Sequence, residues 1–401
     1  MTKYIICLGD GMADEPLASL NNKTPLEAAH IPHIDFLAKK GVCGQVHTVP
    51  DGLHPGSDIA NMGLLGYDPR QYHTGRGPIE AASMDIQVAS NQVVFRCNLV
   101  HINQGIMTDF TAGHISTEEA ETLIMALNDE LQDEFSQFFP GVSYRHILLL
   151  PDQFTDLVTC APHDIIDQTI EAHLPHGTHA DILTQFITRA NRILSAHPIN
   201  QQRIQNGLSP ANAIWPWSQG KMPQLPPFKE KYQLSGGIIT AVDLLKGLGQ
   251  LCGLETPHIQ GATGFIDTNY QAKVNAALKI LDTHDFVYIH IEAPDECGHM
   301  GDEALKTKAI EDFDQQIINP ICEYIKTQPD TVVMVLPDHP TPCHLKTHTN
   351  HPVPFLIYHP TITADPIQHY TEKDTQNSPL KFKSPWELLA HFLNQSPQQG
   401  Q

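Results

Sequence analysis

The chain has 401 residues, of which 41% are apolar, so it can bury more than one core, and roughly 150 residues per domain predicts two or three domains. Its 45 acidic and 24 basic residues give a net charge of −21, which disfavours nucleic acid and anionic membranes as partners. No apolar run approaches the roughly 20 residues of a membrane span, and no apolar signal segment follows Met1. We therefore expect a cytoplasmic protein.

The 8 cysteines form no CxxC pair, which argues against a disulfide scaffold or a thiolate zinc site.

The N-terminal segment predicts a buried strand followed by short helices. Residues 3–8 form a continuous apolar run that ends at a Gly-Asp-Gly turn, so Asp10 is expected at the end of a strand buried on both faces. Residues 24–27, Thr-Pro-Leu-Glu, carry the signals of a helix start: a capping Thr, Pro in the first turn and Glu three residues after the cap. A second short helix is expected over residues 32–41.

The middle of the chain differs in character and is interpreted as an inserted domain. Residues 73–221 are expected to form a smaller α+β substrate-binding domain, inserted into a domain built from residues 1–72 and 222–401. Helices are expected over residues 117–135 and 179–195, and a Pro-rich exit from the domain is expected over residues 210–228. The polar segment after Asn394 is expected to be disordered.

The C-terminal half alternates strand and helix patterns. Strands are expected over residues 286–292, 331–336 and 352–358, and helices over residues 272–281 and 303–325. This alternation is typical of an α/β fold with a mainly parallel sheet that is covered on both faces.

Three aspartates and three histidines are each expected on a loop just after or between predicted strands: Asp10, Asp295, His299, Asp338, His339 and His348. Open α/β sheets bind ligands at the carboxyl ends of their strands. Any one of these residues alone is more often a turn residue than a ligand, but four such segments at four strand ends indicate a metal site. The donors exceed what one tetrahedral ion needs, so two ions are predicted. Oxygen and nitrogen donors without thiolate suit Mn²⁺, Zn²⁺ or Mg²⁺.

Ser57 is the candidate nucleophile. A Pro-Gly pair precedes it, and it caps or opens a helix that runs towards Leu65. The amides and dipole of a helix N-terminus favour an alkoxide and a phosphate group placed on it, and a metal ion beside the hydroxyl would complete the activation. The alternative is that Ser57 is simply an N-cap, and this segment alone favours that alternative.

Together these segments resemble the archaeal-type cofactor-independent phosphoglycerate mutases, a family of the alkaline phosphatase superfamily. The resemblance runs over nearly the whole chain and is carried by residues 9–14, 55–61, 66–69, 74–78, 295–299, 337–339 and 348–354. It implies a phosphorylated Ser57, one metal ion held by Asp10, Ser57, Asp338 and His339, and a second held by Asp295, His299 and His348. His351 departs from the commoner pattern and is a rival to His348 as a ligand.

The implied reaction interconverts 3-phosphoglycerate and 2-phosphoglycerate in glycolysis and gluconeogenesis, with two divalent ions, Mn²⁺ first among them, and no bisphosphoglycerate. A mutase must also hold the dephosphorylated glycerate, which calls for arginine forks and a closing second domain. The candidates in the inserted region are Arg76, Arg96, Asp109, His114 and Arg145. The expected partner is a small phosphorylated acid, and the sequence leaves the oligomeric state open.

Three alternatives remain at this point. Bacterial members of the subgroup have been proposed to act as homoserine kinases, although the chain has no Gly-rich P-loop and no kinase signature. A phosphatase or phosphonate hydrolase would need the same metals but would not have to retain the dephosphorylated product. A metal-binding regulator without catalysis would leave Ser57 and the arginines unexplained.

Overall fold

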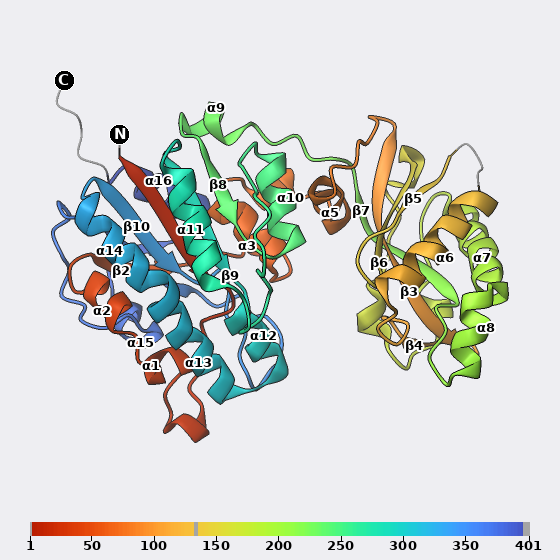
Figure 1. Ribbon diagram of the computed structural model, residues 1–401, viewed down its shortest axis with the longest axis horizontal. Coiled ribbons are helices and arrows are strands. Elements are labelled where there is room, and N and C mark those ends of the chain that lie inside the picture. The colour runs from red at the N-terminus through yellow and green to blue at the C-terminus, as the bar shows by residue number, and fades with distance from the viewer. Residues whose placement is uncertain (1, 132–134, 396–401) are drawn as a thin grey trace. The chain divides into compact units, whose positions relative to one another are not determined.

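A computed structural model describes residues 2–131 and 135–395 (Figure 1). The chain forms two compact units: residues 1–73 with 224–401, and residues 74–223. The boundaries fall after His73 and Pro223, whereas the sequence analysis placed them after residues 72 and 221. The segment from residue 396 onward, part of the expected polar tail, lies outside the described residues.

The first unit is built on a seven-stranded sheet in the order β12-β2-β11-β10-β1-β9-β8. Its strands are β1 (Lys3–Gly9), β2 (Val42–Val46), β8 (Gly236–Ile239), β9 (Phe286–Ile291), β10 (Thr331–Leu336), β11 (Val353–Tyr358) and β12 (Lys381–Phe382). Four of the six pairings are parallel, and only β11 runs antiparallel to its two neighbours. The predicted α/β fold with a mainly parallel sheet is therefore confirmed.

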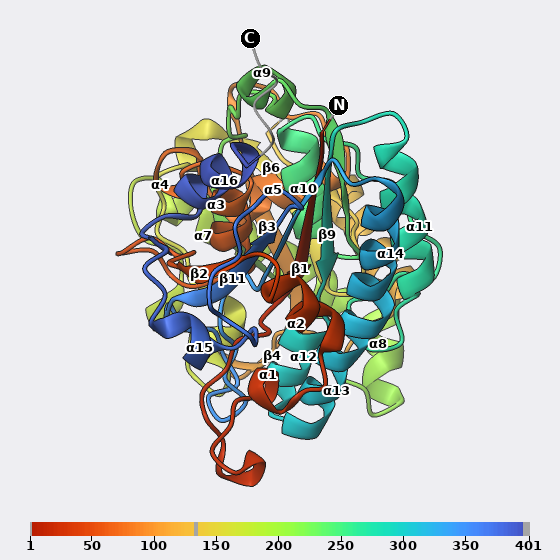
Figure 2. The same ribbon diagram turned by 90° about the vertical axis from the view of Figure 1, so that its left-hand side faces the viewer.

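Helices cover both faces of this sheet, and Figure 2 shows α11 and α14 on one side of β1 and β9, with α3 and α16 on the other. The helices are α1 (Pro25–Ala28), α2 (Pro32–Ala38), α3 (Ser57–Leu64), α4 (Pro69–Tyr72), α9 (Phe228–Tyr232), α10 (Asp243–Leu251), α11 (Tyr270–Leu281), α12 (Ala293–Met300), α13 (Glu303–Phe313), α14 (Asn319–Thr327), α15 (Glu372–Gln376) and α16 (Pro385–Leu393). The predicted capping box at Thr24 is present. Residues 314–318 form a π-helical segment between α13 and α14, just before Pro320, which has no N–H to donate to the preceding turn.

The sheet topology determines where the chemistry-bearing residues lie. The residues of β9 and β10 are fully buried, and β1 pairs with both in parallel, so the carboxyl ends of these three strands open on the same edge. That edge receives Asp10, the start of α12 and the Asp338-His339 pair. Because β11 is antiparallel to β10, its amino end reaches the same edge and brings the preceding loop, with His348, to the same place.

The second unit is an α+β structure around a five-stranded sheet in the order β4-β3-β6-β5, with β7 paired to β3, and every pairing is antiparallel. Its elements are α5 (Arg76–Ser83), β3 (Gln92–Asn103), β4 (Ile106–Asp109), α6 (Thr117–Glu130), β5 (Gln137–Phe139), β6 (Arg145–Pro151), α7 (Ala180–Ala196), α8 (Pro198–Gln205) and β7 (Ala213–Gly220). One expectation is corrected here: residues 210–228 were expected to form a Pro-rich exit, but strand β7 lies within this range. Among the described strands β7 pairs only with β3, and an edge strand tolerates a residue such as Pro216 that cannot donate.

The two helices expected in this unit are present, with one adjustment. Helix α7 matches the prediction for residues 179–195, and α6 ends at Glu130, before residues 132–134, which lie outside the described part of the chain. Within the described residues, no helix combines the length and the apolar character needed to cross a membrane.

Candidate active site

The six predicted aspartates and histidines lie together at the carboxyl edge of the first sheet. Asp10, Asp295, Asp338 and His339 are buried, whereas His299 and His348 are partly exposed. One expectation is corrected: Asp295 and His299 lie inside α12 rather than on a loop, because this helix begins almost directly after β9, with Pro294 in its first turn. Their four-residue spacing then places them on one helix face.

Asp295, His299 and His348 form what we call the outer cluster. Their donor atoms lie within 4.8 Å of one another. The Nε2 atoms of the two histidines are 2.9 Å apart, and each is 3.3–3.4 Å from one oxygen of Asp295. Nδ1 of His299 donates to the backbone carbonyl of Lys346 at 3.0 Å, so the Nε2 of a neutral ring carries a lone pair towards the other two residues. The hydrogen bond to Asp295 raises the pKa of His299 to about 9, so a cation that binds all three residues would take the place of a proton.

Asp10, Asp295 and His339 form a second group, the inner cluster, with donor atoms again within 4.8 Å of one another. Nε2 of His339 lies 3.6 Å from Oδ1 of Asp10 and 3.4 Å from Oδ2 of Asp338. Asp295 therefore belongs to both clusters, and Asp338 lies beside the inner one.

Ser57 is brought to the inner cluster by α3. Gly56 is the N-cap and adopts an extended conformation, and Ser57 is the first residue of the helix, so the interpretation of Ser57 as the N-cap is wrong. Its Oγ lies 3.1 Å from Nε2 of His339. The hydroxyl thus sits at the positive end of a helix and within reach of the inner cluster.

The carboxylates at this edge repel one another. Burial, followed by repulsion from Asp338 and Asp295, raises the pKa of Asp10 well above its usual range. Burial, followed by Glu296 and Asp295, raises the pKa of Glu292 to about 8. Asp10 Oδ1 is buried and has no hydrogen-bond partner among the described residues. Concentrated negative charge with an unpartnered oxygen fits a divalent cation.

Asn61 and Tyr288 fix Asp338 and were missed by the sequence analysis. Asp338 Oδ2 accepts from the Asn61 side chain at 2.8 Å, and Asn61 Oδ1 accepts from the Tyr288 hydroxyl at 2.6 Å. Asp338 Oδ1 accepts from the amides of Gly11 and His339. The orientation of this carboxylate is therefore set by its neighbours before any ligand binds.

His290 is a further residue that the sequence analysis missed. Its Nε2 lies 2.8 Å from Asp10 Oδ2, and its Nδ1 lies 3.2 Å from the hydroxyl of Thr240. Burial lowers its pKa to about 3, so the ring that contacts Asp10 is neutral. The available signal was a polar residue inside the otherwise apolar strand β9, since a buried imidazole needs partners for both nitrogens.

The two rival histidines differ in position. His348 has a side chain that is 21% exposed and contacts Asp295, whereas the side chain of His351 is 64% exposed and lies 3.8 Å from Glu15. Of the two, only His348 contributes to the clusters described above.

Arginines gather in the second unit. Arg96 on β3 is buried, with Nε 2.9 Å from a carboxylate oxygen of Glu80 and its guanidinium 4.4 Å above the ring of Trp217. Burial lowers its pKa to about 10; Glu80 opposes this shift, and the charges of Arg76 and Arg145 add to it. The three predicted arginines therefore lie within electrostatic reach of one another.

The environments of the other two arginines differ. Arg76 opens α5, and its Nε is buried without a hydrogen-bond partner among the described residues. Arg145 lies 5.4 Å from the ring of Tyr144. His163, which the sequence analysis missed, lies with its ring 5.3 Å from that of Trp217. These side chains present hydrogen-bond donors that suit an anion.

Asp109 and His114 belong to a turn in the same unit. The carboxylate of Asp109 accepts from the amide and the hydroxyl of Thr111 and from the amide of Gly113, each at 2.7 Å. His114 is exposed, with a φ of 49°. The carboxylate of Asp109 is thus occupied by the turn itself.

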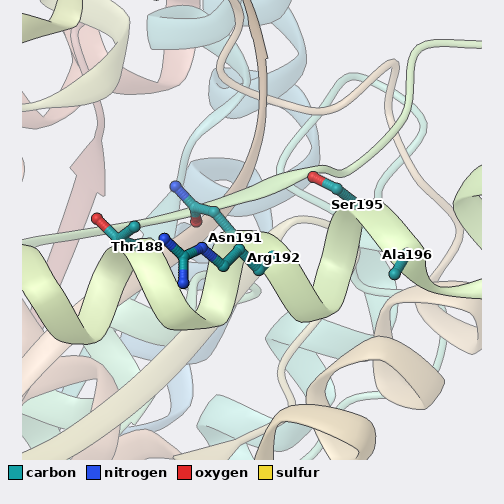
Figure 3. A pocket seen from close by; sticks show the side chains of 5 residues that line it. All are labelled: Thr188, Asn191, Arg192, Ser195 and Ala196. Atoms are coloured by element: carbon teal, nitrogen blue, oxygen red, sulfur yellow. The ribbon is translucent and has the colours of Figure 1, made fainter.

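A pocket along α7 holds none of the predicted residues (Figure 3). It is lined by Thr188, Asn191, Arg192, Ser195 and Ala196. Asn191 is occupied, because its Oδ1 accepts from the amide of Ile214 at 3.0 Å. This pocket has no carboxylate or imidazole in its lining and does not resemble the clusters of the first unit.

Comparison with known proteins identifies the family. A sequence model described as 2,3-bisphosphoglycerate-independent phosphoglycerate mutase matches residues 38–200. A protein of that name from Methanosarcina barkeri is 47% identical over 96% of this chain and 98% of its own length. The chain belongs to this family. A Geobacter sulfurreducens protein, named as a probable member, is 44% identical over 98% of this chain and all of its own length.

Two solved structures share this fold over nearly the whole chain, and the second is named as a member of the family. A Pyrococcus horikoshii protein superposes with a TM-score of 0.83 at 27% identity, covering 100% of this chain and 99% of the other. A cofactor-independent phosphoglycerate mutase from Thermoplasma acidophilum gives a TM-score of 0.68 at 28% identity, covering 98% and 99%. The resemblance inferred from the sequence motifs is confirmed.

Proposed function

We propose that this mutase-family chain interconverts 3-phosphoglycerate and 2-phosphoglycerate through a phosphoserine at Ser57, without bisphosphoglycerate and without nucleotide. The observation that carries the proposal is the position of Ser57 Oγ, at the first residue of α3 and 3.1 Å from His339 Nε2 beside the inner cluster. Glycolysis and gluconeogenesis, cytoplasmic pathways that contain this interconversion, are the expected setting.

The proposed roles of the chain's own groups follow from this position. Ser57 Oγ forms a bond to phosphorus as the bond between phosphorus and the substrate oxygen breaks, and the serine proton ends on the departing hydroxyl. In the second half, the other hydroxyl of glycerate attacks the phosphoserine, and its proton returns to Ser57. The free amides at the start of α3 hold the phosphoryl oxygens in both halves.

We propose that two divalent ions are held at this edge. Asp10, Ser57, Asp338 and His339 would hold one, and Asp295, His299 and His348 the other. The unpartnered Oδ1 of Asp10 and the two facing Nε2 atoms of the outer cluster support this assignment. When bound, such ions lower the pKa of a hydroxyl and neutralise phosphoryl oxygens. Mn²⁺ is the ion proposed first, and the oxygen and nitrogen donors without thiolate also suit Zn²⁺ or Mg²⁺.

We assign the substrate's glycerate part to the second unit. Arg76, Arg96 and Arg145 would bind its carboxylate, since a guanidinium fork matches a carboxylate in shape and charge. Holding the glycerate while the phosphoryl group waits on Ser57 separates a mutase from a phosphatase, which would release both.

The test uses the full-length chain with Mn²⁺ and 3-phosphoglycerate and no nucleotide. We expect 2-phosphoglycerate, detected with an enolase-coupled assay, and little free phosphate. Ser57→Ala should lower turnover by at least about 1000-fold, because the covalent step loses its nucleophile. Ser195→Ala, on the exposed surface of α7, is the matched control and should behave as the parent.

Two other outcomes would contradict the proposal. Phosphorylation of homoserine with ATP, in the absence of mutase turnover, would indicate the kinase. Free phosphate as the main product would indicate the phosphatase.

A further inference from the structure

Thr341 touches both clusters. It is fully buried, its Oγ1 donates to Oδ1 of Asp295 in a short hydrogen bond, and the same oxygen lies 3.3 Å from Nδ1 of His339. The carboxylate it meets is shared by the two clusters, and the imidazole it meets is the one that faces Ser57. A single hydroxyl therefore connects the groups proposed to hold both ions.

The donors and acceptors that each group offers determine the direction of the two Thr341 contacts. A hydroxyl has one proton, and an ionised carboxylate can only accept, so the Thr341 proton points at Asp295. The contact with His339 must then run the other way, with Nδ1–H donating to Thr341. In a neutral His339 this leaves Nε2 with its lone pair, and Nε2 is the atom that lies 3.1 Å from Ser57 Oγ.

We infer that Thr341 is a positioning residue that sets the tautomer of His339 and the rotation of the Asp295 carboxylate, so that both clusters are ready to bind cations together. The inference rests on the metal sites of the proposed function. His299 is set in the same way from the same loop, because its Nδ1 donates to the carbonyl of Lys346. One loop thus determines which nitrogen each of these two imidazoles presents.

Hydrogen bonds from Lys306 and to Asp14 hold the loop that carries Thr341. Lys306 is fully buried and donates to the carbonyls of Thr341 at 2.8 Å and Ala13 at 3.1 Å, and to the carboxylate of Asp14 at 2.8 Å. Asp14 in turn accepts from the amide of Cys343 at 3.1 Å. This buried pair ties the loop after β10, which carries Thr341, to the loop after β1, which begins at Asp10.

A glycine makes the close approach possible. Gly11 has a φ of +59°, and a Cβ there would lie 2.5 Å from both Thr341 Oγ1 and Asp295 Oδ1. Only a residue without a side chain leaves room for this hydrogen bond. The Gly-Asp-Gly turn therefore serves the contact between Thr341 and Asp295 as well as the placement of Asp10.

The experiment measures Mn²⁺ affinity and content of the full chain, by competition with a chelator and by elemental analysis, alongside mutase kinetics. Thr341→Val keeps the shape and removes the hydroxyl, and we expect Mn²⁺ affinity and kcat to fall about 10- to 100-fold with little change in KM. Thr341→Ser keeps the hydroxyl and should restore both. Thr331→Val is the matched control, because Thr331 is equally buried and its hydroxyl donates to the carbonyl of Gln328, far from either cluster in the hydrogen-bond network of the described residues.

The outcomes separate this inference from the proposed function. Parent-like Mn²⁺ affinity and kcat in Thr341→Val would overturn the inference, and so would a Thr341→Ser variant as weak as the Val variant. If Thr341→Val did not fold, Thr341→Ala would take its place, judged by the same comparison with Ser. A parent that binds Mn²⁺ but has no mutase turnover would refute the proposed function, while the metal-affinity comparison would still decide the role of Thr341.

Discussion

The two units of the chain gather opposite charges, and they do so by different means. In the first unit, Asp10, Asp295 and Asp338 meet because parallel strands end at one edge of a sheet. In the second unit, Arg96 is held in the middle of β3 by Glu80 and by the face of Trp217. Backbone topology brings the acids together, whereas side-chain packing brings the arginines together.

This difference indicates what each unit needs from a ligand. Burial, followed by repulsion from Asp338 and Asp295, raises the pKa of Asp10, and a divalent cation would favour its ionised form. The lowered pKa of Arg96 shows the reverse situation, in which burial and neighbouring arginines disfavour the positive charge. A divalent cation would complement the charge gathered in the first unit, and an anion would complement that of the second.

After the loss of Ser57, the largest effect is expected at the outer cluster, where the two rival histidines provide a matched pair. His348→Ala removes a donor at the point shared by Asp295 and His299, so Mn²⁺ content should fall from two ions per chain and turnover should drop by more than about 100-fold. His351→Ala should leave both unchanged, because that side chain is exposed. Elemental analysis and the coupled assay would check this pair, and a metal loss in the His351 variant alone would reverse the assignment.

The part of the site that could be predicted from the sequence is the part that topology determines. Asp10 and the Asp338-His339 pair follow apolar runs directly, so a strand prediction was enough to bring them to one edge. His348 could be included for the same reason, since its loop precedes a predicted strand. The helix that holds Asp295 was missed, because a Pro shortly after a strand is as typical of a loop as of a first helical turn.

The residues that were missed are fixed by tertiary contacts. The contacts of Asn61 with Asp338, of His290 with Asp10 and of Thr341 with Asp295 each join residues that are more than 40 positions apart in the sequence. Strand β7 was missed because Pro216 argues against a strand, and only the edge position beside β3 makes a proline acceptable there. No local pattern contains that information.

An intermediate effect is expected among the arginines. Arg76 is a sharper probe than Arg96, because its Nε has no hydrogen-bond partner among the described residues, whereas loss of Arg96 would also leave Glu80 without its ion pair. Arg76→Ala should lower kcat/KM for 3-phosphoglycerate about 10- to 100-fold, the cost of one charged hydrogen bond, without changing Mn²⁺ content. Arg192→Ala, on the exposed side of α7, is the control. An unchanged kcat/KM in Arg76→Ala would remove that residue from the substrate site.

The smallest effect is expected on stability and concerns Glu372 in the first unit. Glu372 at the start of α15 accepts from the amide of Asp14 at 3.1 Å and from the hydroxyl of Thr24 at 2.8 Å. Burial raises its pKa from 4.5 to about 7. The folded chain therefore keeps a proton that the unfolded chain releases, so this group's contribution is fully present below pH 4.5 and is lost as the pH rises through about 7.

Glu372→Gln should remove that pH dependence. The amide is neutral at every pH, can accept from Asp14 and can donate to Thr24, so the free energy of unfolding of the variant relative to the parent should increase between pH 5 and pH 8, by at most about 3 kcal/mol. Urea unfolding at several pH values would measure this difference, with the exposed Glu387→Gln on α16 as the control. Mutase turnover should be unchanged, because the amide of the variant can keep both hydrogen bonds that hold the loop of Asp14. A difference between variant and parent that stays constant from pH 5 to pH 8 would show that Glu372 is ionised in the folded chain across this range.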